Sequence, residues 1–197
     1  MNKIMFNDKF GLTQAVLEYR KTQTRRTMPT HIETMLRHSR ALISSNRTKE
    51  QIGYALSKYG ETMSPYKTGN IVAIAQSYKD CGAEAFYWKQ TPGWTNKMFV
   101  KANLMPHHIK IERVRVERLQ DISEENCIRE GVYEVSQGRY KSDGLNFIGH
   151  NPIAVYASLI KKSAAQKYGI KIHSYLSMIS NLSIKRIDYG KESWRCF

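Results

Sequence analysis

The most chemically informative stretch of this 197-residue chain is residues 20–26, which read Arg-Lys-Thr-Gln-Thr-Arg-Arg. Cations contact phosphates, and hydroxyl and amide groups can hydrogen-bond nucleobase edges. In an extended segment, alternation places Lys21, Gln23 and Arg25 on one face and the residues between them on the other. Four cations in seven residues predict a segment that does not bury as a block.

A second group of polar residues follows an apolar strand expected over residues 71–75, which read Ile-Val-Ala-Ile-Ala. The strand is apolar on both faces, so we expect it at the centre of a sheet. Gln76, Ser77, Tyr78 and Lys79 come directly after it, where a buried strand can present polar groups to a site. The alternative is an ordinary strand exit without function.

Residues 86–101 mix five aromatic side chains with lysines. Such a segment can stack bases while its lysines contact phosphates. The alternative is an irregular loop whose aromatic side chains cover the core, and this reading is the simpler one.

Metal and cofactor chemistry has little support in the sequence. His107 and His108 are adjacent at the start of an expected strand, so their side chains point to opposite faces. The three cysteines, Cys81, Cys127 and Cys196, form no CxxC pair. We therefore expect no metal, no cofactor and no disulfide scaffold, as is typical of a reducing cytoplasm.

The overall charge favours a polyanionic partner. The chain has 31 Lys and Arg against 17 Asp and Glu, a formal net charge of +14. Such an excess is typical of proteins that bind nucleic acid, although it can also serve solubility alone. No apolar run reaches the roughly 20 residues that span a bilayer, so we expect no membrane partner.

Helical spacing predicts a short first helix with an apolar stripe of Leu12, Ala15, Val16 and Tyr19. Residues 30–62 are expected to form an added helical region. Within it, Thr48-Lys-Glu-Gln51 is a candidate capping box and Gly60 a candidate helix stop.

A long strand is expected over residues 109–119. Its apolar residues change phase between Ile111 and Val114, which predicts a bulge near Glu112-Arg113. A short helix should follow, with Ser123 as its N-cap and Gly131 as its end.

Asn151-Pro152 predicts the start of another helix, with the asparagine as cap and the proline in the first turn. Its buried stripe is expected to consist of Ile153, Tyr156, Ala157 and Ile160.

Three of these stretches together resemble the ASCH family of the PUA-like superfamily. Residues 20–26 are similar to the family motif GRKTQTRR. Residues 67–72, Lys-Thr-Gly-Asn-Ile-Val, are similar to its K-x-G-D turn and strand. Residues 114–131, VRVERLQDISEENCIREG, are similar to its VRVERLQDISEEDAIAEGI. The likeness covers roughly residues 1–163 and is strongest to small ASCH-like proteins of phages and integrated elements of Bacteroides-type bacteria.

The resemblance implies an α+β fold, a small twisted β-barrel with helices packed around it. It also implies recognition of RNA or of a modified nucleotide in a cleft lined by residues 21–24 and the end of the next barrel strand. On this reading the nucleic-acid-binding residues are Arg20, Lys21, Gln23, Arg25, Arg26, Gln76, Tyr78 and Lys79.

Some members of the family hydrolyse acylated cytidine with a Lys, Thr and Glu constellation, and another branch cuts RNA. Lys21 and Thr24 match the first two groups, whereas Gln76 stands where related sequences carry Glu. A glutamine side chain cannot accept a proton as a carboxylate does, so the leading hypothesis is binding without catalysis. Asp80 or Glu84 would have to supply the missing carboxylate for hydrolysis. Hydrolysis is the alternative, and a phage accessory protein that acts through protein contacts is a third.

The likeness ends before residues 166–197. Read in a shifted frame, codons for residues 167–181 can encode Val-Trp-Asp-Lys-Asn-Pro-Phe-Val-Phe-Val-Tyr-Asp-Phe-Glu, which is similar to the last strand of related chains. We hypothesise a frameshift near residues 161–166 that replaced this strand, against the alternative of a genuine extension. The domain is then residues 1–165, followed by a basic tail expected to be helical or irregular and loosely packed.

Overall fold

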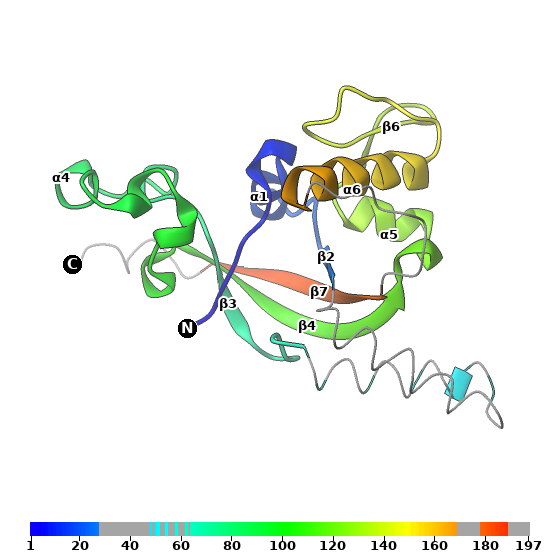
Figure 1. Ribbon diagram of the computed structural model, residues 1–197, viewed down its shortest axis with the longest axis horizontal. Coiled ribbons are helices and arrows are strands. Elements are labelled where there is room, and N and C mark those ends of the chain that lie inside the picture. Colours follow the sequence, from blue (N-terminus) through cyan, green and yellow to red (C-terminus); the bar gives the residue numbers. More distant parts are fainter. Residues whose placement is uncertain are drawn as a thin grey trace.

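A five-stranded sheet forms the centre of the protein (Figure 1). The computed structural model describes residues 1–27, 48, 50, 51, 54, 58, 62, 64–168 and 178–188. The strands lie in the order β1-β3-β4-β7-β2. Their bounds are β1 Lys3–Ile4, β2 Gln23–Thr27, β3 Ile71–Ile74, β4 His107–Arg118 and β7 Met178–Asp188. β1 and β3 are parallel and the other neighbours are antiparallel.

The expected α+β class is confirmed, but the closed barrel is not. Within the described residues, β1 and β2 end the sheet on opposite sides and do not pair with each other. The sheet is curved and open, and the helices α1, α5 and α6 gather on one side of it (Figure 1).

The remaining elements surround this sheet. The helices are α1 Leu12–Leu17, α4 Ala85–Trp88, α5 Glu124–Arg129 and α6 Pro152–Tyr168, and a separate hairpin pairs β5 Tyr133–Ser136 with β6 Arg139–Lys141. The single-turn 3₁₀ helices are η1 Asp8–Phe10, η2 Pro92–Trp94, η3 Lys97–Phe99, η4 Ala102–Leu104 and η5 Leu119–Asp121.

The local sequence signals explain several of these elements. β3 lies between β1 and β4, and Val72, Ala73 and Ile74 are fully buried, as a strand apolar on both faces requires. The register between β4 and β7 shifts between Ile111 and Arg113, so the predicted bulge is confirmed.

Helix caps were also well predicted. Ser123 Oγ accepts the Asn126 N–H at 3.3 Å, and Gly131 follows α5 with φ of 100°. Asn151 Oδ1 accepts the Ile153 N–H at 2.7 Å. The Thr48–Gln51 capping box is present in both directions, at 3.3 and 3.2 Å. Gly60 and most of residues 30–62 lie outside the described residues.

Two apolar stripes differ from expectation. In α6 the buried side chains are Val155, Tyr156 and Leu159, while Ala157 is exposed, so the buried face is rotated by about one residue. Tyr19 is not on the buried face of α1, because the helix ends before it and its backbone turns to a φ of 61°. Its exposed fraction is 56%.

The C-terminal segment overturns one expectation. Residues 178–188 were expected to be helical or irregular, yet they form β7, which lies between β4 and β2. Ile184 enters the main core together with Ile109 and Ile111 of β4. A segment that contains several β-branched and small polar residues can join a sheet whatever its origin, because both neighbouring strands supply backbone partners. The frameshift remains a hypothesis about the gene.

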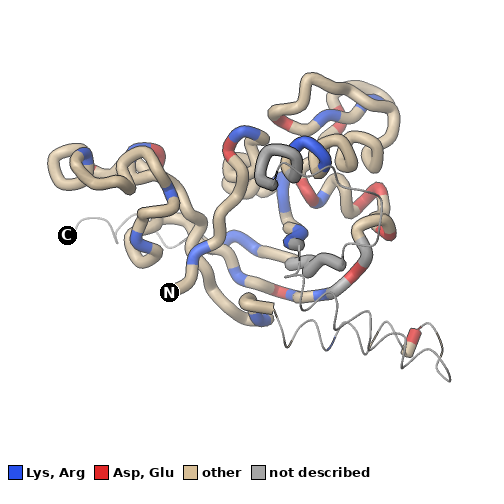
Figure 2. The backbone as a smooth tube through the Cα atoms, in the orientation of Figure 1, with Lys and Arg blue, Asp and Glu red and all other residues tan. Residues whose placement is uncertain are grey.

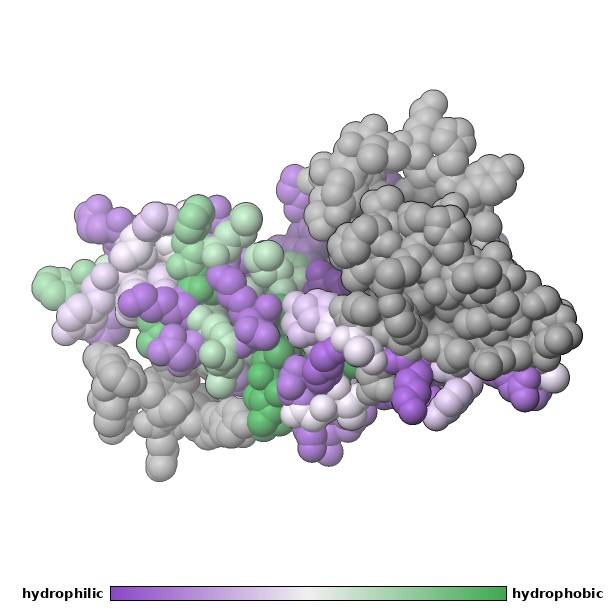
Figure 3. Space-filling model, turned by 60° about the horizontal axis from the view of Figure 1, so that its bottom comes forward, coloured by the Kyte–Doolittle hydropathy of each residue, from purple (hydrophilic) through white to green (hydrophobic). Residues whose placement is uncertain are grey.

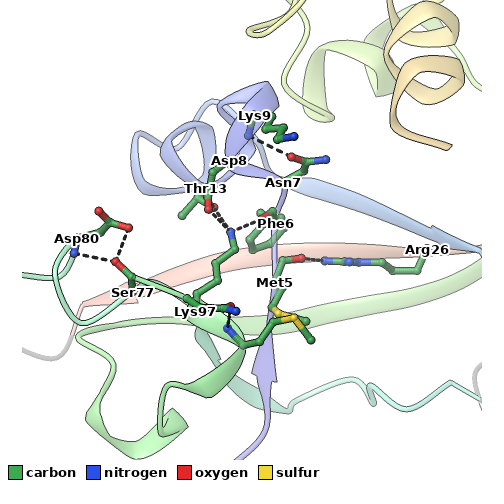
Figure 4. A network of polar contacts seen from close by, with 12 residues as sticks. Met5, Phe6, Asn7, Asp8, Lys9, Thr13, Arg26, Ser77, Asp80 and Lys97 are labelled. Atoms are coloured by element: carbon green, nitrogen blue, oxygen red, sulfur yellow. Dashed lines mark hydrogen bonds and ion pairs between the residues drawn. The ribbon is translucent and has the colours of Figure 1, made fainter. Parts of the chain in front are cut away.

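A lobe formed by residues 76–106 extends from the sheet between β3 and β4 (Figure 1). Its interior holds Tyr78, Val100 and Met105, with Trp88 and Trp94 packed against them. Two lysines fasten the lobe to the N-terminal segment. Lys97 Nζ lies 2.6 Å from Asp8 Oδ2 and also donates to the Phe6 carbonyl (Figure 4). Lys3 Nζ donates to the Met98 and Val100 carbonyls at 2.5 and 3.0 Å.

Candidate functional site

A buried ion pair lies where the chain leaves α1 and enters β2. The Lys21 side chain is 2% exposed and its Nζ lies 2.5 Å from Glu130 Oε2. The same ammonium donates to the Glu130 backbone carbonyl at 2.9 Å. Burial lowers the pKa of Lys21 below its ordinary value, while Glu130 acts in the opposite direction.

Arg25 extends this pair into a network of two cations and two carboxylates. Its side chain is 2% exposed; Nη1 lies 3.0 Å from Glu130 Oε1 and Nε donates to Glu117 Oε1 at 2.7 Å. Residues 20–26 do not bury as a block, since Arg20 and Thr22 remain accessible, but the side chains of Lys21 and Arg25 are buried. Carboxylates from α5 and β4 neutralise them, which is the condition for burying charge.

Backbone hydrogen bonds fix the segment that precedes β2 to α1 and to the end of α5. Thr22 N–H donates to the Arg129 carbonyl and Lys21 N–H to the Ala15 carbonyl, both at 2.9 Å. Glu130 was not identified from the sequence, although its position at the end of a predicted helix indicates a need for nearby cations. It is the C-cap of α5, and a carboxylate at the negative end of a helix is unfavourable unless cations compensate it.

Three further predicted residues are buried beside this network or at the end of β3. Gln23 is 2% and Thr24 4% exposed. Gln76 is 8% exposed, and its Oε1 atom has no hydrogen-bond partner among the described residues. Burying an amide oxygen without a partner is costly, so Gln76 can hydrogen-bond a ligand that enters the protein at this point. Asp80 and Glu84 are both exposed, so neither places a carboxylate at the buried position of Gln76.

Arg20 and Arg26 are engaged in contacts within the protein. Arg20 lies 2.6 Å from Glu18 and 3.3 Å from Asp143, and its guanidinium stacks on the Tyr133 ring at 5.3 Å. Arg26 donates to the Met5 carbonyl (Figure 4) and its guanidinium lies 5.6 Å from the centre of the Phe6 ring.

Tyr78 is 2% exposed and packs on Trp88 with ring centres 4.3 Å apart, while its hydroxyl accepts the Lys101 N–H. It belongs to the interior of the lobe, so the expectation that it stacks a base is not met by this arrangement. Lys79, by contrast, is exposed.

A pocket of about 320 Å³ lies beside the buried network. Four cationic side chains border it, against one carboxylate, that of Glu112. They are Lys21, which lies just before β2, Arg129 at the end of α5, and Lys185 and Arg186 of β7. Figure 2 shows basic positions along β2, β4 and β7. The exposed Tyr19 and Thr22 also border the pocket. Of the site residues predicted from the sequence, only Lys21 and Gln23 do so.

The described part of the chain contains no group of three or more His, Cys, Asp or Glu side chains suited to a metal ion. Among the helices of the same residues, none has the length and apolar character needed to cross a bilayer.

Comparisons with known proteins give little further information. No family model matches the chain, and no curated protein matches it. A crystal structure of protein EF3133 from Enterococcus faecalis V583, described under the family model DUF984, is similar with a TM-score of 0.47 and 15% sequence identity. The match covers 98% of this chain and 80% of that protein. At this identity and TM-score the likeness identifies neither a family nor an activity.

Proposed function

We propose that the chain is an ASCH-like module that binds nucleic acid, with RNA or a modified nucleotide as the ligand. The observation that carries the proposal is the cationic pocket between β2, α5 and β7. It is large enough for one nucleotide unit, and its lining has a fourfold excess of cationic over anionic side chains. The net charge of +14 supports the same class of partner.

The burial of Lys21 and Arg25 changes which residues contact phosphate. Both cations already face Glu130, and withdrawing them from it would leave a buried carboxylate without a charge partner. Lys185 is exposed, and the side chain of Arg129 is 49% exposed. These two residues are therefore the phosphate contacts that we propose, while Lys21, which also borders the pocket, stays paired with Glu130.

The test is the salt dependence of binding to mixed-sequence single-stranded RNA. The double variant Arg129→Gln/Lys185→Gln should bind about tenfold or more weakly at moderate salt, and the slope of log K against log[salt] should fall by about two units. The matched control is Lys9→Gln/Lys89→Gln, which removes the same charge from exposed positions outside the pocket. Equal affinity and slope in the two double variants would rule out the pocket as the binding surface.

One observation favours hydrolysis as the alternative function. A lysine whose pKa is lowered by burial lies in contact with a carboxylate, and Thr24 lies between Gln23 and Arg25 on β2. On this alternative Glu130 would supply the carboxylate for which Gln76 is unsuited, and Lys21 would activate the Thr24 hydroxyl.

Release of acetate from acylated cytidine separates the two functions. If the chain only binds, the wild-type protein shows little or no release, and Gln76→Glu raises any residual rate. Turnover by the wild type that Thr24→Ala abolishes and Thr24→Ser retains would establish the alternative. The thermal stability of each variant must be measured beside its rate, because Thr24 is buried.

A further inference from the structure

Tyr19 occupies a backbone conformation that its side chain disfavours. It follows Glu18, the C-cap of α1, and has a φ of 61°, in the left-handed region. Among the described residues it is the only non-glycine with a positive φ. Glycine is the residue that ends helices in this way without steric cost, because it lacks a Cβ atom. Strain of this kind persists where the side chain contributes something that glycine cannot.

The ring of Tyr19 is held in a defined position at the edge of the pocket. The Arg186 guanidinium carbon lies 5.0 Å from the ring centre, which is a cation–π contact. Arg186 is itself anchored, because it donates to the Leu17 carbonyl and its Nη2 lies 3.4 Å from His107 Nδ1. An aromatic ring backed by a fixed guanidinium loses little freedom when a second planar group stacks on it.

More than half of Tyr19 nevertheless remains accessible, with an exposed fraction of 56%. The rest of the pocket is lined mostly by polar and cationic side chains, with Val16 and Ile184 as its apolar members and Glu112 as its one carboxylate. An exposed aromatic ring beside cations is the combination that binds a base by stacking and its phosphate by charge.

We propose that Tyr19 is the base-stacking residue of this pocket, and that the ligand is a phosphorylated nucleoside unit with an unpaired base. The base stacks on the ring face opposite Arg186, and the phosphate lies toward Arg129 and Lys185. The inference rests on the proposed function and adds a requirement that charge alone does not impose. A duplex, whose bases are already stacked and paired, should bind less tightly than a single strand of equal charge.

The experiment compares two probes of equal length and charge: an oligouridylate, and an abasic sugar-phosphate oligomer. The wild type should bind the oligouridylate more tightly. Tyr19→Gly should weaken oligouridylate binding by about tenfold, as is usual for the loss of one stacked pair, and leave abasic binding unchanged. Tyr19→Phe should bind both probes as the wild type does.

Thermal stability provides the control for folding. Tyr19→Gly removes the unfavourable backbone conformation, so its melting temperature should not fall, and lost binding then cannot be ascribed to unfolding. Tyr19→Leu keeps the strain but removes the ring, and it should lose oligouridylate binding as the glycine variant does. If Tyr19→Gly binds oligouridylate like the wild type, the stacking role is overturned while the proposed function stands. If the wild type binds neither probe, the proposed function is overturned and this inference with it.

Discussion

Residues 20–27 and the lobe of residues 76–106 use their side chains in opposite ways. The first is rich in cations, and the side chains of Lys21 and Arg25 are each only 2% exposed because Glu130 lies between them. The second is rich in aromatic residues, and Phe86, Tyr87 and Phe99 are 89%, 61% and 61% exposed. Figure 3 shows hydrophobic residues interspersed with hydrophilic ones on the face of this lobe that is turned forward.

The comparison shows that residue type alone does not decide what is available to a ligand. Charges can be buried when counter-charges with fixed positions surround them. Aromatic side chains remain exposed to solvent when the segment that carries them has too small an apolar interior to bury them all. In the lobe, Tyr78, Trp88 and Trp94 occupy the small interior, and the remaining rings stay on its surface.

The largest expected effect comes from the carboxylate shared by the two buried cations. Glu130→Gln leaves Lys21 and Arg25 buried with one charge partner, Glu117, remaining for the arginine. Loss of one member of a buried charge network costs about 3–5 kcal/mol, which denaturant unfolding will measure. The control Glu125→Gln removes an exposed partner of Arg129 and should cost less than about 0.5 kcal/mol. If both variants lost a similar free energy of unfolding, the buried carboxylate would contribute no more to stability than the exposed one.

Adding a methyl group at Gly93, inside the lobe, should have the next largest effect on stability. A Cβ atom at Gly93 would lie 2.4 Å from Tyr78 Cε2 and 3.2 Å from the Phe99 carbonyl oxygen. Since Tyr78 is enclosed, it cannot move aside without disturbing Trp88. Gly93→Ala should therefore destabilise the protein by about 2–3 kcal/mol in denaturant unfolding. An unchanged unfolding midpoint would mean that the interior of the lobe is loosely packed.

The lysine that fastens the lobe should contribute somewhat less. Lys97→Ala removes the contact with Asp8 and the hydrogen bonds to Phe6 and Thr13. We expect a loss of about 1–2 kcal/mol and faster amide hydrogen exchange in residues 76–106, because these bonds join the lobe to the N-terminal segment. Lys89→Ala, at an exposed position of the same lobe, is the matched control. Exchange that is equally slow in both variants would show that apolar packing alone holds the lobe.

The smallest effect is expected at the most exposed ring. Phe86→Ser should change the free energy of unfolding by less than about 0.5 kcal/mol, because the residue is 89% exposed. Trp88→Ser, two positions away, should be clearly more destabilising since Trp88 packs on Tyr78. A large loss of stability in the Phe86→Ser variant would show that this ring packs against the protein and is not one of the exposed aromatic side chains of the lobe.

Features that depend on neighbouring residues could be predicted from the sequence alone. Ser123 and Gly131 bound α5, and the change of apolar phase after Ile111 marks the bulge of β4. Each follows from backbone geometry and hydrogen bonding within a few positions, which a local pattern records.

Which polar groups remain accessible to a ligand depends instead on contacts between distant segments of the chain. Lys21 meets Glu130 at a separation of 109 residues, and no local pattern indicates that this carboxylate neutralises the cation. The same holds for Tyr78, which the lobe encloses, and for Tyr19, which the end of α1 leaves exposed against Arg186. Burial and charge pairing are properties of the assembled sheet, because they depend on which distant segments the fold brings into contact.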